Sequence, residues 1–273
     1  MKLAVSNIAW PMEIEEEALS VMRAEGISGL EAAPTRWWPD WKGFSLEAGN
    51  AFRERYAALG FTIPSLQAIL FAKPDYKLFG DEFQRDGLLN HLRMCADLAS
   101  ALGARSLVFG APKNRELNGI PEETAFAMAH ELFAAVAPYF AARSVCLCLE
   151  ANPPQYGCQF MTNSLDAGRL VRAVDSPGFG LHLDTACMHL AQENIPEAIQ
   201  RNFDILHHFH ASEPFLVSFE APVIDHESAA KVLRNLGYRG WVSLEMRETN
   251  PPVGGVTRAV KFLADTYGSE ERL

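Results

Sequence analysis

The sequence has no apolar segment long enough to cross a membrane and no excess of positive charge. Its apolar runs fall well short of the roughly 20 residues that a transmembrane helix requires, so we expect no membrane partner. Lysine and arginine number 24 against 34 acidic residues, which gives a formal net charge of −10. A nucleic-acid-binding surface carries a basic patch, so we expect no nucleic-acid partner either.

Cysteine is also scarce, and the first residues lack the features of a secretion signal. Five cysteines are an odd number and do not form the compact framework of a disulfide-stabilised domain. The opening stretch, MKLAVSNIAWPMEIEEE, has too short an apolar run and too many acids for a signal peptide. These absences predict a cytoplasmic enzyme.

No low-complexity segment or linker divides the 273 residues, and one repeated unit runs through them instead. Each unit is a short apolar run, then a polar or Pro/Gly-rich loop, then a stretch with helical periodicity. The strands are expected at 3–8, 28–32, 62–68, 106–109, 145–150, 180–184, 205–210 and 241–245. The helices are expected at 14–25, 46–59, 82–102, 122–142, 164–174, 195–201, 226–236 and 255–266.

Eight consecutive strand–helix units predict a parallel sheet covered by helices. The count of eight matches a closed barrel, so the expected fold is α/β, a single (β/α)8 TIM barrel over residues 1–273. An open, doubly wound sheet is the alternative, but no G-x-G-x-x-G pattern lies between the first strand and helix. In a barrel, catalytic groups lie at the C-terminal ends of the strands and in the loops that follow.

Four of the later strands end on a side chain that can bind a cation: Glu150 in CLCLE, Asp184 in GLHLD, His210 in HHFH and Glu245 in VSLE. Each follows an alternating apolar run, so each is expected to point into the barrel mouth. One acid at a strand end is more often a helix cap or an ion-pair partner. Three carboxylates side by side would repel one another, however, and a cation removes that repulsion. The set suits one divalent metal ion, Mn²⁺ first, with Mg²⁺, Co²⁺ or Zn²⁺ as alternatives.

These residues stand in segments that resemble one branch of the xylose isomerase-like TIM-barrel superfamily. The branch is that of the sugar phosphate isomerases and epimerases, which includes the ketose 3-epimerases. The similar segments are LE at Glu150, HLDT at 182–185, HxHxxE at 208–213, GYRGWVSLE ending at Glu245, and LGARSLVFG at the fourth strand. The resemblance implies a metal bound by Glu150, Asp184, His210 and Glu245, with the two glutamates also acting as acid and base.

The expected reaction follows from a metal ion held between carboxylates. A cation chelated by adjacent hydroxyl and carbonyl oxygens of a sugar acidifies the C–H bond between them. Glu150 and Glu245 could then remove a proton from one face and return one to the other, through a metal-bound enediolate. We therefore expect a metal-dependent isomerase or epimerase acting on a small carbohydrate, as a homodimer or homotetramer.

Two other functions stay open at this point. A lyase or dehydratase acting on a keto sugar or a dehydroshikimate-like acid would use the same metal site and the same enolate chemistry. The second is a binding module that holds the metal ion but catalyses no reaction. The complete set of four ligands argues against it, because a protein that has lost its chemistry usually loses at least one ligand.

Two positions depart from the ketose 3-epimerases that the chain resembles. The histidine three residues after the metal-binding aspartate is here Cys187, with His189 two residues further on. The arginine six residues after the ligand histidine is here Leu216. Both positions contact the sugar in the family, so we do not expect a free ketohexose as the substrate.

Six further side chains are candidates for binding the substrate: His182, His189, Glu213, Lys113, Arg115 and Gln67. His182 shares the expected face of Asp184, so it either touches the substrate or orients a ligand. Lys113 and Arg115 follow the fourth strand in GAPKNR, where they either bind an anionic group or form a solvated loop.

Alternation along ILHHFHASE places His208 and His210 on one face of the strand and His207 on the other. We expect His208 to be a core histidine with its hydrogen bonds satisfied. Glu31, at the end of the second strand, either contacts the substrate or forms a buried ion pair.

Cys146 and Cys148 share the strand parity of Glu150, so they are expected to face the barrel interior. A C-x-C pair is compatible with zinc, but no second cysteine pair completes such a site. Small core residues are the favoured interpretation.

Overall fold

The apolar runs of the sequence form eight strands, each parallel to its neighbours. The computed structural model describes residues 1–268. Its strands are β1 (Lys2–Ser6), β2 (Gly29–Glu31), β3 (Ser65–Leu66), β4 (Ser106–Phe109), β5 (Cys146–Glu150), β6 (Phe179–Asp184), β7 (Leu206–Ser212) and β8 (Trp241–Glu245). Their order in the sheet is β2-β1-β8-β7-β6-β5-β4-β3. Strands that are neighbours in the chain are therefore neighbours in space, as successive strand–helix–strand crossovers of one hand require.

Hydrogen bonds between β2 and the segment around β3 close the sheet into a barrel. The backbone N–H of Leu30 donates to the carbonyl of Thr62 (2.8 Å), and that of Ala32 donates to Ser65 (3.0 Å). The N–H of Gln67 donates back to the carbonyl of Ala32 (2.9 Å). The expected (β/α)8 barrel is confirmed for the described residues, and positions 269–273 of the expected domain lie outside them.

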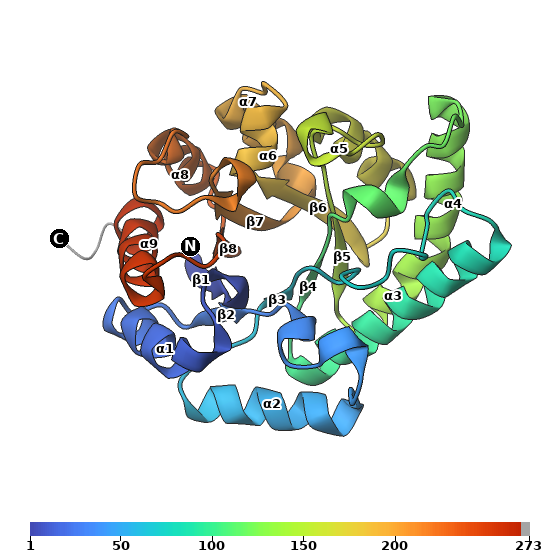
Figure 1. Cartoon of the computed structure of the whole chain (residues 1–273). Helices are drawn as coiled ribbons and strands as arrows, with labels where there is room; N and C mark the ends of the chain where they lie inside the picture. Colours follow the sequence, from blue (N-terminus) through green and yellow to red (C-terminus); the bar gives the residue numbers. More distant parts are fainter. Residues whose placement is uncertain (269–273) are drawn as a thin grey trace.

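Helices cover the outside of the barrel as a ring (Figure 1). They are α1 (Glu15–Ala24), α2 (Leu46–Ala58), α3 (Glu82–Leu102), α4 (Glu122–Ala141), α5 (Ser164–Val174), α6 (Thr185–Leu190), α7 (Ile195–Asn202), α8 (His226–Asn235) and α9 (Pro252–Tyr267). Their inner faces pack on the strands in one continuous apolar core, so burial of apolar surface stabilises the barrel. Within residues 1–268, no helix combines the length and apolar character that a membrane span needs.

The third strand is much shorter than the sequence predicts. A strand is expected over 62–68, whereas regular strand structure covers only Ser65–Leu66. Pro64 has no N–H to donate to a strand ladder, and its carbonyl accepts the N–H groups of Arg105 and Ser106. Proline therefore limits the regular strand to the residues that follow it.

Two helices also differ from the expected ones. Helix α6 is not among the expected helices; it begins directly after Asp184, because that carboxylate accepts the N–H of Cys187 (2.7 Å) as an N-cap. The last helix begins at Pro252 instead of Gly255. Proline suits the first turn of a helix, where its missing N–H has no intrahelical partner to lose.

An extra residue in β7 interrupts the alternation of its side chains. The pairing of β7 with β6 steps from Leu206 to His208 across a single residue of β6, so His207 is the extra residue of a β-bulge. His207 consequently lies against Gly180 and Cys146, where a Cβ built on Gly180 would be 3.1 Å from the His207 Cβ. Simple alternation predicts that His207 lies on the face opposite His208 and His210. That prediction is wrong, because side chains alternate regularly only in a strand without a bulge.

Replacing Gly29 tests how tightly the strands β1, β2 and β8 pack. A Cβ at this position would press on the Trp241 ring and lie 2.6 Å from the Ala4 Cβ. We expect Gly29→Ala to lower the free energy of unfolding by about 1–3 kcal/mol, the usual cost of overpacking, measured by urea denaturation. Gly254→Ala is the control, because its Cβ would meet nothing closer than 3.5 Å. An equal loss in both variants would contradict the packing argument.

Candidate active site

The C-terminal ends of four neighbouring strands bring the predicted ligand residues to one end of the barrel. Glu150 ends β5, Asp184 ends β6 and Glu245 ends β8, while His210 lies two residues before the end of β7. One ligand atom from each of Glu150, Asp184 and His210 lies within 4.8 Å of the others, and of one from His182. Three of the four predicted ligands therefore converge, and His182 joins them.

Glu245 lies beside this group, against His210. Its Oε2 is 3.3 Å from the Nδ1 of His210, and the Oδ2 of Asp184 is 3.8 Å from the same nitrogen. The imidazole of His210 thus faces two of the carboxylates with one nitrogen. Its other nitrogen, Nε2, is 2.8 Å from the Oε2 of Glu31.

His182 is fully buried at the centre of the group. Its Nε2 is 3.7 Å from the Oε1 of Glu150, and within residues 1–268 neither ring nitrogen has a hydrogen-bond partner. Burying a polar group without a partner is costly, so a histidine in this state is placed to bind something that the described chain does not supply.

Neighbouring side chains orient two of the carboxylates. Asp184 accepts hydrogen bonds from the N–H of Cys187 and from the hydroxyl of Ser212 (2.6 Å). Glu150 accepts one from the Nδ2 of Asn152 (2.9 Å). Such contacts fix the direction in which a ligand presents its oxygen atoms.

Glu31 forms the buried base of the site and does not line its cavities. Its carboxylate accepts hydrogen bonds from Ser65 (2.6 Å), Ser243 (2.8 Å) and the Nε2 of His208 (2.8 Å). Burial raises the pKa of Glu31, but the charges and hydrogen bonds of His210 and His208 outweigh it and hold that pKa well below its ordinary value. Of the two alternatives for Glu31, the structure shows the buried ion pair, and His208 is the satisfied core histidine.

Crowding among the acids changes how readily they lose their protons. Burial, followed by the charges of Asp184 and Glu245, raises the pKa of Glu150 to about 8, against the opposing effects of His210 and Asn152. Burial likewise raises the pKa of Glu245, although His210 opposes it. Shifted acids gathered in a cleft are typical of functional sites, and a bound cation would offset their repulsion.

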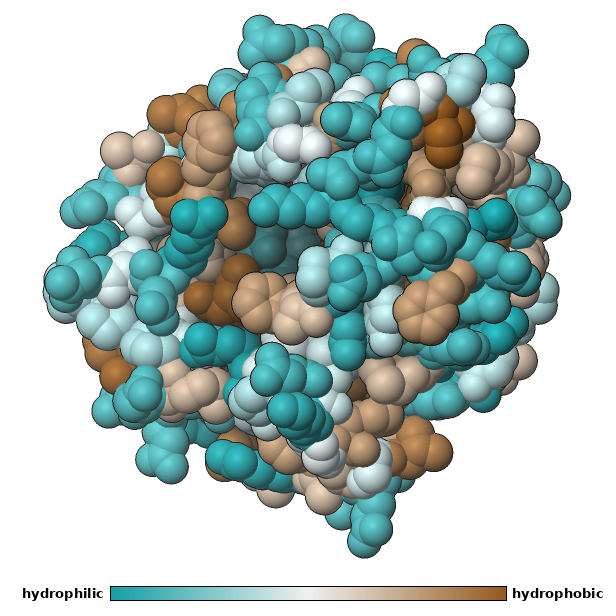
Figure 2. Space-filling model, turned by 45° about the vertical axis from the view of Figure 1, so that its right-hand side comes forward, coloured by the Kyte–Doolittle hydropathy of each residue, from teal (hydrophilic) through white to brown (hydrophobic). Residues whose placement is uncertain are grey.

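Two adjoining cavities, of about 370 and 420 Å³, open over these residues. Glu150, Tyr156 and Glu245 line both of them. The molecule is hollowed near the centre of the face in Figure 2, with hydrophilic residues at the bottom of the hollow. The volumes are those of a site for a small molecule.

Two of the predicted substrate-binding residues border the first cavity, namely Gln67 and Lys113. The Nε2 of Gln67 donates to the hydroxyl of Ser6 (2.5 Å), and its buried Oε1 has no partner in the described part of the chain. Lys113 is exposed in the loop after β4. Both can therefore reach a ligand in this cavity.

The other four predicted substrate-binding residues, His182 among them, line neither cavity. Arg115 is fully buried and does not lie at the open mouth. Its Nη2 donates a hydrogen bond to the Oδ1 of Asn152 (2.5 Å). Glu213 is fully buried, and its carboxylate accepts from His226 (2.9 Å) and from the N–H of Val223 (3.0 Å), so its contacts hold the loop after β7. His189 lies near the end of α6.

Three residues of the site were not predicted from the sequence: Asn152, Ser212 and Arg247. Arg247 lines the second cavity, and its N–H donates to the carbonyl of Leu216 (2.9 Å). A cationic side chain therefore stands beside the position where the similar epimerases have an arginine. The sequence signal that could have identified Arg247 was its position two residues after Glu245, in the loop that follows a barrel strand.

The sequence profile described as "Xylose isomerase-like TIM barrel" matches residues 19–266. The chain belongs to this family. No curated protein matches the sequence significantly.

Several solved structures share the fold of this family member at low sequence identity. A D-psicose 3-epimerase has a TM-score of 0.81 at 14% identity, over 98% of this chain and 100% of that one. A D-psicose 3-epimerase from Clostridium cellulolyticum H10 has a TM-score of 0.80 at 16% identity, over 98% and 100%. A 3-keto-D-glucoside 4-epimerase from E. coli has a TM-score of 0.78 at 16% identity, over 97% and 99%. Each covers nearly the whole barrel, so no large insertion separates the chains.

Replacing Glu31 tests whether the buried carboxylate stabilises the two histidines. Glu31→Gln keeps the shape but removes the charge that His208 and His210 face. Breaking a buried ion pair costs about 3–5 kcal/mol, and we expect a loss of that size in the free energy of unfolding by urea denaturation. Ser243→Ala removes only one hydrogen bond to the same carboxylate and should cost about 1 kcal/mol. A loss no larger in Glu31→Gln than in Ser243→Ala would contradict this role.

Proposed function

We propose that the protein is a divalent-metal-dependent epimerase or isomerase of a sugar or sugar derivative. The observation that carries the proposal is the buried group of Glu150, His182, Asp184 and His210, with Glu245 against it, at the floor of a cavity of small-molecule size. The fold shared with the sugar epimerases supports it, and no structural relative reported above is described as a lyase. The lyase or dehydratase alternative is therefore not favoured.

Glu150, Asp184, His210 and Glu245 would hold the metal ion, and His182 offers a fifth donor. The donor set fits a cation, because crowded buried acids stand beside the imidazole of His182, whose ring nitrogens have no hydrogen-bond partner among residues 1–268. Carboxylate oxygens with imidazole suit Mn²⁺, and Mg²⁺, Co²⁺ or Zn²⁺ are alternatives. Bound there, the ion would make the C–H bond next to a substrate carbonyl more acidic.

The two glutamates are the proposed acid and base. Glu150 on β5 and Glu245 on β8 are separated in the sheet by β6 and β7, yet both line the same two cavities. A substrate held between them would present one face to each carboxylate. One glutamate would take the proton from carbon and the other would return a proton to the opposite face, which inverts that carbon.

The cavity walls point to a substrate different from a free ketohexose. Cys187 and Leu216 stand where the similar epimerases have a histidine and an arginine, and both line the second cavity together with Arg247. Lys113 borders the first cavity. Two basic side chains at the mouth favour a substrate with an anionic group, such as a phosphate or a carboxylate.

The proposed function is tested by hydrogen exchange with solvent. The Mn²⁺-loaded protein is incubated in D₂O with a panel of ketoses, sugar phosphates and sugar acids. Deuterium entering a single carbon of one substrate, together with its epimer or isomer, would support the proposal. Formation of an unsaturated product would indicate a lyase, and no exchange with any member of the panel would count against enolate chemistry.

Replacing Asp184 tests the metal site through the amount of Mn²⁺ that the protein binds, without an activity assay. Asp184→Asn keeps an oxygen for the N-cap of α6 but removes the charge, and we expect its Mn²⁺ affinity to fall at least about tenfold. Elemental analysis after equilibrium dialysis measures the bound ion. Asp225→Asn is the matched control, because Asp225 also caps a helix, α8, through the N–H of Ser228 (3.0 Å). Equal Mn²⁺ content in both variants would remove Asp184 from the site.

Replacing either glutamate tests the acid and base roles. Glu150→Gln and Glu245→Gln should each lower kcat by about 10²–10⁴, the usual scale of general acid–base catalysis, at full metal occupancy. With two bases, one variant should still exchange the substrate's proton with D₂O without forming product. Glu248→Gln, in the exposed loop after β8, is the control and should keep its activity. Full turnover in both metal-loaded variants would rule out the two-glutamate mechanism.

A further inference from the structure

We propose that Cys146, Cys148 and His207 form a second metal site, specific for a thiophilic ion such as Zn²⁺, at the N-terminal end of the barrel. The site is independent of the proposed function. Cys146 lies four residues and Cys148 two residues before Glu150 on the same strand, which places them roughly 13 Å and 7 Å from Glu150 at about 3.3 Å per residue.

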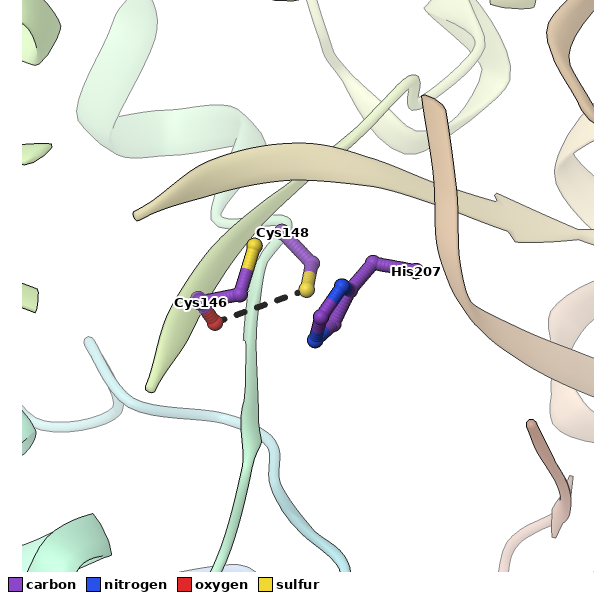
Figure 3. A group of neighbouring side chains, drawn as sticks. All are labelled: Cys146, Cys148 and His207. Atoms are coloured by element: carbon purple, nitrogen blue, oxygen red, sulfur yellow. Dashed lines mark hydrogen bonds between the residues drawn. The ribbon is translucent and has the colours of Figure 1, made fainter. Parts of the chain in front are cut away.

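The three side chains converge from two different strands. Figure 3 shows the two cysteines of β5 close to the imidazole of His207 from β7, with the Cys148 Sγ donating to the carbonyl of Cys146 (3.5 Å). One donor atom from each lies within 4.8 Å of the other two. Tetrahedral bonds of about 2.3 Å to sulfur and 2.0 Å to nitrogen would place neighbouring ligands roughly 3.5–3.8 Å apart. Binding would require the Cys148 thiol to give up its hydrogen bond to the carbonyl of Cys146 (3.5 Å).

Two local features of the backbone make this convergence possible. The β-bulge places His207 on the side of the sheet that carries Cys146. Gly180, on the intervening strand β6, leaves the space between them open, because a Cβ there would lie 2.8 Å from the Cys146 Sγ. A side chain at position 180 would separate the two donors.

One of the two thiols, that of Cys146, is acidic enough to bind a metal ion as a thiolate. The Cys148 thiol and the His207 imidazole together lower the pKa of Cys146 to about 6, although burial opposes them. The pKa of His207 is raised, since its interaction with Cys146 outweighs the partial desolvation of its ring. Cys146 can therefore be a thiolate near neutral pH, the form in which cysteine binds metal. Burial and the neighbouring Cys146 raise the pKa of the Cys148 thiol well above its ordinary value, so an ion bound here would have to displace the proton of Cys148.

The site is open on one side. A cavity of about 590 Å³ is lined by Cys146 and His207 together with Arg172, Asp175 and Asp204. Asp204 is paired with Arg172 (2.6 Å). Three protein ligands beside an open cavity leave a fourth position for water or an exogenous ligand, so the structure assigns an exchangeable ion to this site.

The two metal sites differ in the ions that they prefer. The mouth offers carboxylates and imidazoles, which suit hard and borderline ions. The N-terminal site offers two sulfurs and one nitrogen, which select soft ions. Of the other cysteines, Cys187 has its Sγ 3.9 Å from the Oε1 of Glu150, so an experiment must separate its thiol from those of Cys146 and Cys148.

Titration with Cd²⁺ tests the proposal, because thiolate–Cd²⁺ bonds give a charge-transfer absorption that carboxylate ligands do not. The reduced, metal-free full-length protein is titrated while Mn²⁺ occupies the mouth. We expect one Cd²⁺ per chain with the intensity of two thiolates, and Zn²⁺ should displace it. Cys146→Ser and Cys148→Ser should each halve the absorption and weaken binding at least about 100-fold, more than the loss of an outer-sphere contact costs.

Control variants make each outcome decisive. His207 is exposed, so His207→Ala should fold normally and still weaken Cd²⁺ binding. Cys95→Ser should bind as the unchanged protein does, although Cys95 also contacts a histidine, His91 (3.4 Å). Loss of the absorption in Cys187→Ser but not in Cys146→Ser would overturn the proposal, and so would its absence from the unchanged protein. A thiol titration that finds Cys146 and Cys148 joined as a disulfide in the purified protein would also overturn it.

Discussion

The carboxylate of Glu31, buried between His208 and His210, is the interaction on which the geometry of the mouth depends. An isolated buried charge is costly, and here two imidazoles and two hydroxyl groups compensate it. Because residues 208 and 210 lie two apart on β7, their side chains share one face of the strand, and one carboxylate from β2 reaches both rings. The Nε2 of His210 is thereby engaged below the site, and its Nδ1 is left to face Asp184 and Glu245.

Much of this arrangement could be predicted from the sequence, because a parallel barrel converts chain position into spatial position. Every strand ends at the same rim, so Glu150, Asp184 and Glu245 were expected to meet although they are far apart in the chain. Strand parity then placed His182 with Asp184, and the structure shows both at the mouth. The eight repeated units predicted a parallel sheet covered by helices, and their number together with the missing G-x-G-x-x-G pattern favoured the closed barrel over an open, doubly wound sheet.

The contacts that could not be predicted are those between side chains on different loops. Asn152 joins Glu150 to Arg115 across 37 residues of sequence, and no local pattern relates these positions. The bulge at His207 reverses one side chain without any signal in the apolar pattern. Arg115 could not be placed either, because the choice between a buried and a solvated guanidinium depends on what the neighbouring loop offers as an acceptor.

Strand β5 carries both proposed donor sets, and their separation along it has a chemical consequence. Zn²⁺ binds most sites of nitrogen and oxygen donors more tightly than Mn²⁺ does, so a carboxylate-rich mouth alone cannot reject zinc. Cys146 and Cys148, in the first half of this strand, and His207 on β7 offer zinc the softer ligands that it prefers. The residues with the same inward parity thus change from sulfur at Cys146 and Cys148 to oxygen at Glu150. Along five residues, one strand can direct two classes of metal to opposite ends of the barrel.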